Sequence, residues 1–296
     1  MSFSATDAAF EGFRVVRRAP LSLLAWVLVY LVCGMGMFAA VAPAFTRMMA
    51  MSAALQETSN PSFEELSELG RVMGGLMLTV LPLALAMGAV LSAAVCRAVL
   101  SPEARAWGYV RVGMDEIRVL ATQIIVSLVI FAITMIIYMA LVALGLAAHM
   151  MNQPWLWLFV VLGAFAGIGL VIWLSVRWSL AAPIAMAEKR IAPFASFALT
   201  RGRFWPLLGM AILAGVMAVV VSLLFSIVTF PLEAAFGGTQ RLAAYDGQDF
   251  VAILTQAWPI VLVWVLVNAV SSALQLAVMY APFTAAYLAL KGEKSV

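Results

Sequence analysis

Arginine is the residue type in this sequence best suited to recognise a ligand. In three short segments between apolar runs, an aromatic residue precedes an arginine by four positions, at Phe10 and Arg14, Trp107 and Arg111, and Phe197 and Arg201. A guanidinium group holds a phosphate through two parallel hydrogen bonds, so arginines that converge could bind a phosphate-bearing headgroup. The candidates are Arg14, Arg17, Arg18, Arg111, Arg118, Arg177, Arg201 and Arg203.

A simpler interpretation of these arginines is that they only orient a membrane protein, which needs nothing beyond positive charge. That interpretation is sufficient for most of them. Arg177 is the exception, because it lies beside Trp178 inside a helical pattern. We expect it to have a specific partner, such as a phosphate group or Glu188.

A second set of polar residues falls inside an apolar run. Asn268, Ser271, Ser272 and Gln275 are spaced so that they share one helix face. Similar stripes are formed by Ser222, Ser226 and Thr229, and by Gln123, Ser127 and Thr134. These stripes have two open interpretations, which are hydrogen bonding between helices and a polar cavity that accepts a lipid headgroup.

Residues for hydrolytic or metal chemistry are scarce. His149 is the single histidine, and the sequence has no CxxC pair, phosphate-binding glycine loop or GxSxG motif. A hydrolytic metal site needs several ligands that converge on one point. We therefore expect no catalytic residue, no metal site and no cofactor, and a chain that is not an enzyme.

The elements that position these residues are membrane spans. Hydrophobic residues make up 65% of the chain and charged residues 10%, against about 25% charged residues in a soluble domain. Such a composition excludes a soluble globular protein and a disordered chain. Uncharged runs, one of them divided by a turn at 149–154, predict six transmembrane helices at about 21–44, 73–97, 119–148, 155–181, 206–230 and 258–281.

The distribution of basic residues predicts the orientation. Of the 17 Lys and Arg residues, only Arg47, Arg71 and Arg241 fall in the connections on one side. Basic residues accumulate on the cytoplasmic side, so both termini are predicted to be cytoplasmic in a multi-pass protein of the inner membrane. Nucleic-acid binding is not expected, because these charges would meet lipid headgroups first.

The spans form three hairpins in a single membrane domain, 1–296. Each hairpin is predicted to follow an amphipathic interfacial helix on the cytoplasmic side, which suggests repeats at 1–100, 101–192 and 193–296. The second of these helices should begin at Ser101 and Pro102. On the opposite side, Ser62 and Glu65 predict a capping box for a short helix that Gly70 ends.

The segment 177–205 resembles part of a bacterial family of six-span proteins, the glycerophosphoryl diester phosphodiesterase membrane domain. The residues that carry the resemblance are Arg177-Trp178, Pro183, Glu188, Arg201-Gly202 and Trp205. In that family the phosphodiesterase belongs to a separate soluble domain. The resemblance therefore implies a membrane module concerned with lipids, without the enzyme.

These observations favour a non-enzymatic accessory or scaffold protein in membrane or envelope homeostasis. Its expected partners are membrane lipids, anionic phospholipid among them, whereas the sequence does not identify protein partners. A transporter or permease for a small or lipid-like substrate is the alternative. A polar cavity open to one side would favour transport, and a closed bundle would favour the scaffold.

Overall fold

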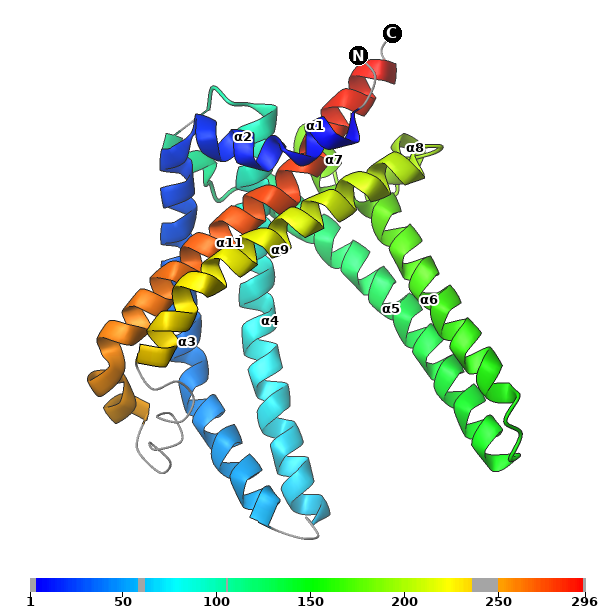
Figure 1. The fold of residues 1–296 in the computed structure, drawn as a ribbon. Coiled ribbons are helices and arrows are strands. Elements are labelled where there is room, and N and C mark those ends of the chain that lie inside the picture. The colour runs from blue at the N-terminus through cyan, green and yellow to red at the C-terminus, as the bar shows by residue number, and fades with distance from the viewer. Residues whose placement is uncertain (1–3, 58–61, 105, 236–249, 295–296) are drawn as a thin grey trace.

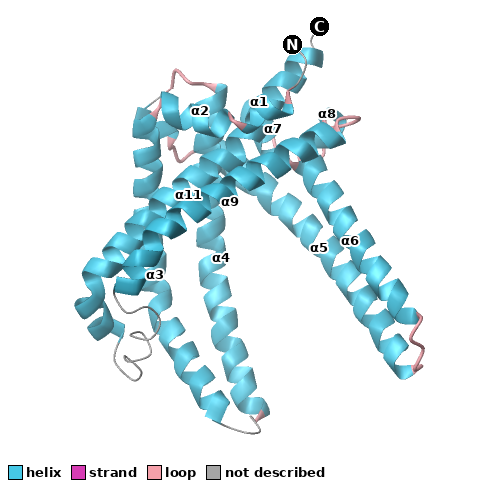
Figure 2. Cartoon of the chain, in the orientation of Figure 1, coloured by secondary structure: helices cyan, strands magenta, loops and turns pink. Residues whose placement is uncertain are grey.

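The computed structural model describes residues 4–57, 62–104, 106–235 and 250–294. These residues form helices joined by short loops, and no strand occurs among them (Figure 2). The predicted all-α class is confirmed.

Six of the described helices are long and apolar enough to cross a membrane, as predicted, so the chain is a multi-pass membrane protein. These helices are α3 (Pro20–Glu57), α4 (Phe63–Leu100), α5 (Met114–Met150), α6 (Leu156–Trp178), α9 (Phe204–Ala235) and α11 (Phe250–Lys294). The shorter helices are α1 (Ala5–Ala9), α2 (Glu11–Arg18), η1 (Ala106–Tyr109), α7 (Ala181–Glu188) and α8 (Ala195–Leu199).

The long helices form three hairpins that meet at one end of the molecule. Figure 1 shows α3–α4 and α5–α6 spreading apart from that common end, while α9 and α11 lie side by side and α11 crosses α3 and α4. Helix α1 and the last turns of α11 lie at the same end.

Three clusters of buried side chains hold the common end together. The first joins α2, α3, α4, η1 and α11, the second joins α1, α6, α7, α9 and α11, and the third joins α4, α5 and α7. Among the largest buried side chains are Trp26, Leu91, Tyr109, Ile184, Leu207, Met210 and Tyr287. We call the part of the molecule that holds these clusters the platform.

The first amphipathic segment is helical, as predicted. Its helices α1 and α2 bury Ala9 and Val15, and Arg14, Arg17 and Arg18 remain exposed. Gly12 lies against the backbone of α11, because a Cβ atom at this position would stand 2.5 Å from the Cα atom of Val278.

The second amphipathic segment is not an interfacial helix, so this part of the prediction is wrong. Residues 101–104 and 106–113 lie outside any α-helix and contain the short turn η1, in which Trp107, Gly108 and Tyr109 have φ angles of 53°, 64° and 64°. One hydrogen bond from α3 and one within the segment stabilise this conformation. Trp26 Nε1 donates to the Gly108 carbonyl oxygen at 2.8 Å, and the Tyr109 hydroxyl donates to the Pro102 carbonyl oxygen at 2.8 Å.

The third segment contains only the five-residue helix α8, which is shorter than the predicted stretch. On the other side of the molecule, the predicted capping box is confirmed at Ser62 and Glu65. Gly70 does not end that helix, however, because α4 continues without a break to Leu100. The predicted threefold repeat stays a prediction, although its three opening segments have different conformations.

The turn between α5 and α6 is confirmed, with Asn152 in the left-handed region at φ 49°. Small residues let these two helices approach closely. At Gly163 an added Cβ atom would lie 2.9 Å from Leu141 Cδ2. At Gly167 it would lie 2.7 Å from Ile137 Cγ2. This geometry is typical of helices that pack within a membrane.

Candidate functional site

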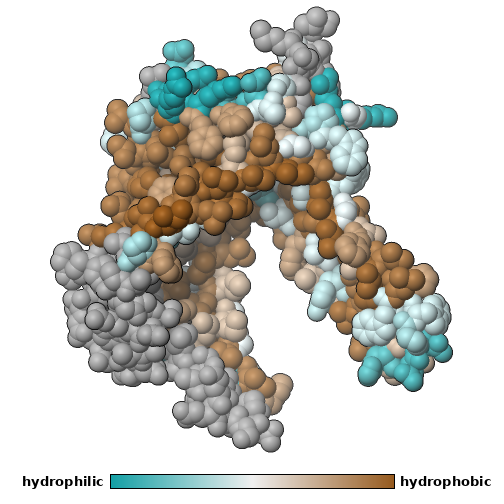
Figure 3. Space-filling model, in the orientation of Figure 1, coloured by the Kyte–Doolittle hydropathy of each residue, from teal (hydrophilic) through white to brown (hydrophobic). Residues whose placement is uncertain are grey.

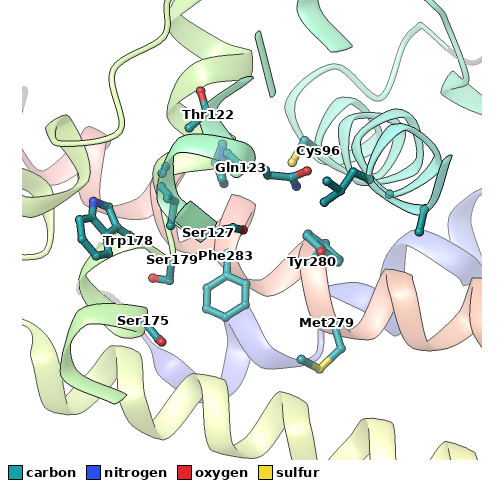
Figure 4. A pocket seen from close by; sticks show the side chains of 17 residues that line it. Cys96, Thr122, Gln123, Ser127, Ser175, Trp178, Ser179, Met279, Tyr280 and Phe283 are labelled. Atoms are coloured by element: carbon teal, nitrogen blue, oxygen red, sulfur yellow. The ribbon is translucent and has the colours of Figure 1, made fainter. Parts of the chain in front are cut away.

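A cavity of about 530 Å³ lies where the hairpins diverge from the platform. Its walls come from α4, α5, α11 and the connected helices α6 and α7 (Figure 4). Figure 3 shows the surface hollowed between α3–α4 and α5–α6, with apolar residues along much of α5–α6. The site is therefore formed only when separate hairpins come together.

Helix α5 supplies a polar wall through Thr122, Gln123 and Ser127. The Thr122 hydroxyl donates to the Arg118 carbonyl oxygen at 2.8 Å, and Gln123 Nε2 donates to Ser92 Oγ on α4 at 3.1 Å. The oxygen atoms of these side chains can still accept hydrogen bonds from a ligand. The stripe predicted on this span therefore supplies both a hydrogen bond between helices, from Gln123 to Ser92, and part of a polar cavity wall.

Helices α6 and α7 supply a second wall with Ser175, Trp178 and Ser179. The two serine hydroxyls donate to carbonyl oxygens of their own helix at 2.8 Å, which leaves their oxygen lone pairs available. The Trp178 side chain is 6% exposed, and its Nε1 atom has no hydrogen-bond partner in the described part of the chain. Its ring packs edge-on against Phe197 at a centroid distance of 5.2 Å.

Helix α11 supplies the apolar wall, with Met279, Tyr280 and Phe283. Among the described residues, no Asp, Glu, Lys, Arg or His lines the cavity. The described lining thus offers uncharged hydrogen-bonding groups beside apolar ones.

The predicted stripe of Asn268, Ser271, Ser272 and Gln275 does not line this cavity. Gln275 Nε2 donates to Ser271 Oγ at 2.9 Å within α11, and Ser271 is buried against the platform. Asn268 is exposed on the same helix. On this span, the observed polar contact lies within the helix, so it supports neither a cavity nor a bond between helices.

The candidate arginines do not converge on one point. Helix α2 lies at one side of the platform and α8 at the other (Figure 1). Arg14 forms ion pairs with Asp7 at 3.1 Å and Glu11 at 3.4 Å, and the hydrogen bonds to these two residues raise the pKa of Arg14. Arg18 pairs with Glu11 at 3.1 Å, and Arg118 pairs with Asp115 at 2.7 Å, whereas Arg17, Arg111 and Arg201 are exposed.

Arg177 has specific contacts, although Glu188 is not one of them. Its Nη1 atom donates to the Phe197 carbonyl oxygen at 3.3 Å and lies 3.4 Å from Thr200 Oγ1. Glu188 instead pairs with Arg190 at 2.7 Å and with Lys291 at 3.8 Å. Of the two partners suggested for Arg177, Glu188 is therefore not in contact with it.

Sequence reasoning missed a buried ion pair between Arg97 and Glu116. Their side chains are 8% and 5% exposed, and Arg97 also donates to the Tyr109 carbonyl oxygen. The sequence places Arg97 at the end of one span and Glu116 just before the next, so opposite charges face the same connection. This pair connects α4 to α5 and holds the loop 101–113 between them.

No group of three or more His, Cys, Asp or Glu side chains in the described ranges is arranged to hold a metal ion. No family model matches the chain, and neither a curated protein nor a solved structure matches it.

Proposed function

We propose that this chain is a non-enzymatic inner-membrane protein that binds a membrane lipid and serves as an accessory or scaffold in membrane or envelope homeostasis. One observation carries the proposal, which is the uncharged cavity between the hairpins. It combines hydroxyl and amide groups with aromatic and methionine side chains. The resemblance of residues 177–205 to the glycerophosphoryl diester phosphodiesterase membrane domain is consistent with a role in lipid biology.

The cavity opens beside hairpins whose outward surfaces are apolar. Exposed side chains on α5 and α6 include Leu128, Phe131, Ile136, Phe165 and Ile168. A lipid acyl chain can lie along such surfaces without leaving the hydrocarbon region. The ester and glycerol groups of the same lipid would then meet Gln123, Ser175 and Ser179.

Filling the cavity tests the proposal. Gly88 lines it, and a Cβ atom at Gly88 would meet no other atom within 4 Å, so Gly88→Leu adds volume without a backbone clash. Gly215→Leu on α9 is the matched control, because this glycine also has open space and does not line the cavity. Lipid that co-purifies with the full chain in mild detergent is quantified by mass spectrometry.

Gly88→Leu should lower the amount of bound lipid, and Gly215→Leu should leave it unchanged. Equal lipid content in both variants and in the original protein would remove the cavity from the proposal. Unfolding temperatures of the three proteins show whether the variants remain folded.

A transporter or permease for a lipid-like or small substrate is the alternative that the same cavity supports. Reconstituted vesicles distinguish the two functions. A scaffold should leave the movement of fluorescent lipids or small solutes unchanged, whereas a transporter should accelerate it and lose that activity in Gly88→Leu.

The proposed orientation places both termini in the cytoplasm. Reporter fusions at Glu57 and Gly247 should then report the outside, and fusions at Glu188 and the C-terminus should report the cytoplasm. Gly247 lies outside the described residues, so its side is predicted from the basic residues alone. A cytoplasmic signal at Gly247 would contradict the six-span topology.

A further inference from the structure

Arg177 differs from the other buried or paired arginines in its surroundings. Arg14, Arg18, Arg97, Arg118 and Arg190 each contact a carboxylate. Arg177 is partly buried and contacts no carboxylate in the described part of the chain. Because removing a cation from water costs free energy, an anion from outside this part of the chain would offset that cost.

The guanidinium group of Arg177 is held in place by aromatic rings. Its Cζ atom lies 5.3 Å from the centroid of Trp173 and 5.9 Å from that of Phe197. The backbone around it is also fixed, because the Ser196 hydroxyl donates to the Arg177 carbonyl oxygen at 2.6 Å. A cation positioned in this way loses little side-chain entropy when it binds a ligand.

Arg177 has hydrogen-bonding capacity left. Its Nη1 atom makes the two long contacts to Phe197 and Thr200, whereas its Nε atom is buried and has no acceptor among the described residues. No hydrogen bond of Nη2 occurs among those residues either. An oxyanion that approaches Nη2 would supply both an acceptor and the missing negative charge.

Further positive charge comes directly after Thr200, the residue whose hydroxyl Arg177 contacts. Arg201 comes directly after Thr200, and Arg203 follows a left-handed turn at Gly202 with φ 76°. The turn is closed by a hydrogen bond from the Arg203 nitrogen to the Thr200 carbonyl oxygen at 3.2 Å. Arg201 is exposed, so it adds positive charge beside the contact of Arg177 with Thr200.

The aromatic side chains of the connection from Phe194 to Trp205 indicate that this connection lies at the depth of phospholipid headgroups. Trp205 and Phe194 are exposed at the same end of α6 and α9, and Trp173 is partly exposed below them. Tryptophan is enriched where the hydrocarbon region meets the headgroups. A phosphate at this depth would normally belong to a lipid.

We infer that Arg177, supported by Arg201, binds the phosphate group of an anionic phospholipid. The inference rests on the proposed function only in taking its ligand from the membrane, since this site is separate from the cavity. An inorganic phosphate or a soluble phosphate ester shares the chemistry that this site recognises, so the test includes both sources.

The test is native mass spectrometry of the full chain with phosphatidylglycerol and phosphatidylcholine. Arg177→Lys keeps the charge but loses the planar fork, and Arg14→Lys is the matched control at an exposed, paired arginine. The original protein and Arg14→Lys should prefer phosphatidylglycerol. Arg177→Lys should bind this lipid about tenfold more weakly, because it loses a charge-assisted hydrogen bond.

A second variant, Arg201→Gln, keeps the test decisive if Arg177→Lys does not fold. It should also weaken phosphatidylglycerol binding selectively. Added inorganic phosphate or glycerol phosphate should not displace the lipid at millimolar concentration. Displacement would overturn the lipid source and indicate a soluble phosphate ligand.

Equal retention of phosphatidylglycerol by the original protein and both variants would overturn the inference. So would equal retention of the two lipids by the original protein. Gly88→Leu distinguishes failure of the Arg177 site from failure of the cavity proposal. Blocking the cavity should lower the total amount of bound lipid but preserve the preference for the anionic lipid.

Discussion

The two halves of α4 are in different environments although they belong to one continuous helix. From Ala89 to Ala98 the helix buries nearly every side chain in the platform, and Arg97 in this stretch has a buried ionic partner. Toward its beginning, Phe63, Met77, Leu78 and Leu81 are exposed. The second half of the helix therefore packs against protein, whereas the apolar side chains of the first half face the lipid.

The same contrast extends over the whole molecule. Helix α5 buries Glu116, Val119 and Thr122 in its first turns and exposes Phe131, Met139 and other apolar side chains farther along. Lipid tails are as apolar as these side chains, so burying them against protein would gain little. The platform should therefore be sensitive to substitution, and the far halves of the hairpins should be tolerant.

Breaking the buried ion pair should have the largest effect. Glu116→Ala leaves Arg97 buried without a countercharge and should lower the free energy of unfolding by about 3–5 kcal/mol. Asp115→Ala, which breaks the more exposed pair with Arg118, should cost about 1 kcal/mol or less. Denaturant titration in detergent micelles measures both. Equal losses would mean that burial does not distinguish the two pairs.

The next largest effect is expected at a glycine of the platform. A Cβ atom at Gly12 would meet the α11 backbone at 2.5 Å, so Gly12→Ala should destabilise the protein by about 1–3 kcal/mol. Gly36→Ala in α3 has open space and should be neutral or slightly stabilising, because alanine favours the helix. A stable Gly12→Ala protein would show that α2 can move away from α11.

A smaller effect is expected within the α5–α6 hairpin. Gly167→Ala would meet the side chain of Ile137 at 2.7 Å, and a rotamer change can relieve this contact at a cost of about 0.5–1.5 kcal/mol. Gly169→Ala meets no atom within 4 Å and serves as the control. The unfolding temperatures of the two variants, measured in the same detergent, should differ in this order.

The smallest effect is expected at Trp107, whose side chain is 89% exposed although its backbone belongs to the platform. Trp107→Ala should change the free energy of unfolding by no more than about 0.5 kcal/mol. The same denaturant titration measures it. If the free energy of unfolding fell by more than about 1 kcal/mol, Trp107 would make a stabilising contact beyond those among the described residues.

The spans can be predicted from the sequence because each is encoded locally, by a long apolar run with charges at its ends. The turn at 149–154 is local in the same sense. The loop 101–113 could not be predicted, because its amphipathic pattern favours a helix while its conformation depends on Trp26, which lies far away in the chain. A hydrogen bond between distant residues here outweighs the local preference.

The cavity illustrates the same limit. The stripe that includes Gln123 and Ser127 is visible in the sequence, and it does line the cavity. The more regular stripe at 268–275 does not, since it lies along another part of α11. Ser175 and Ser179 flank Arg177 near the end of their own span, and no periodicity relates them to α5. Only the way the hairpins meet brings these residues together.

The contact of α1 and α2 with α9 and α11 has a consequence for how the protein is made. Helices α1 and α2 bury Ala9 and Val15 against α9 and α11, which are synthesised much later. At roughly 5–20 residues per second, synthesis from α2 to the end of α11 takes on the order of 15–60 s. During this time α1 and α2 lack their contacts with α11. Insertion of α11 then completes their burial, so a quality-control protease could recognise chains that have not inserted α11 by this exposed surface.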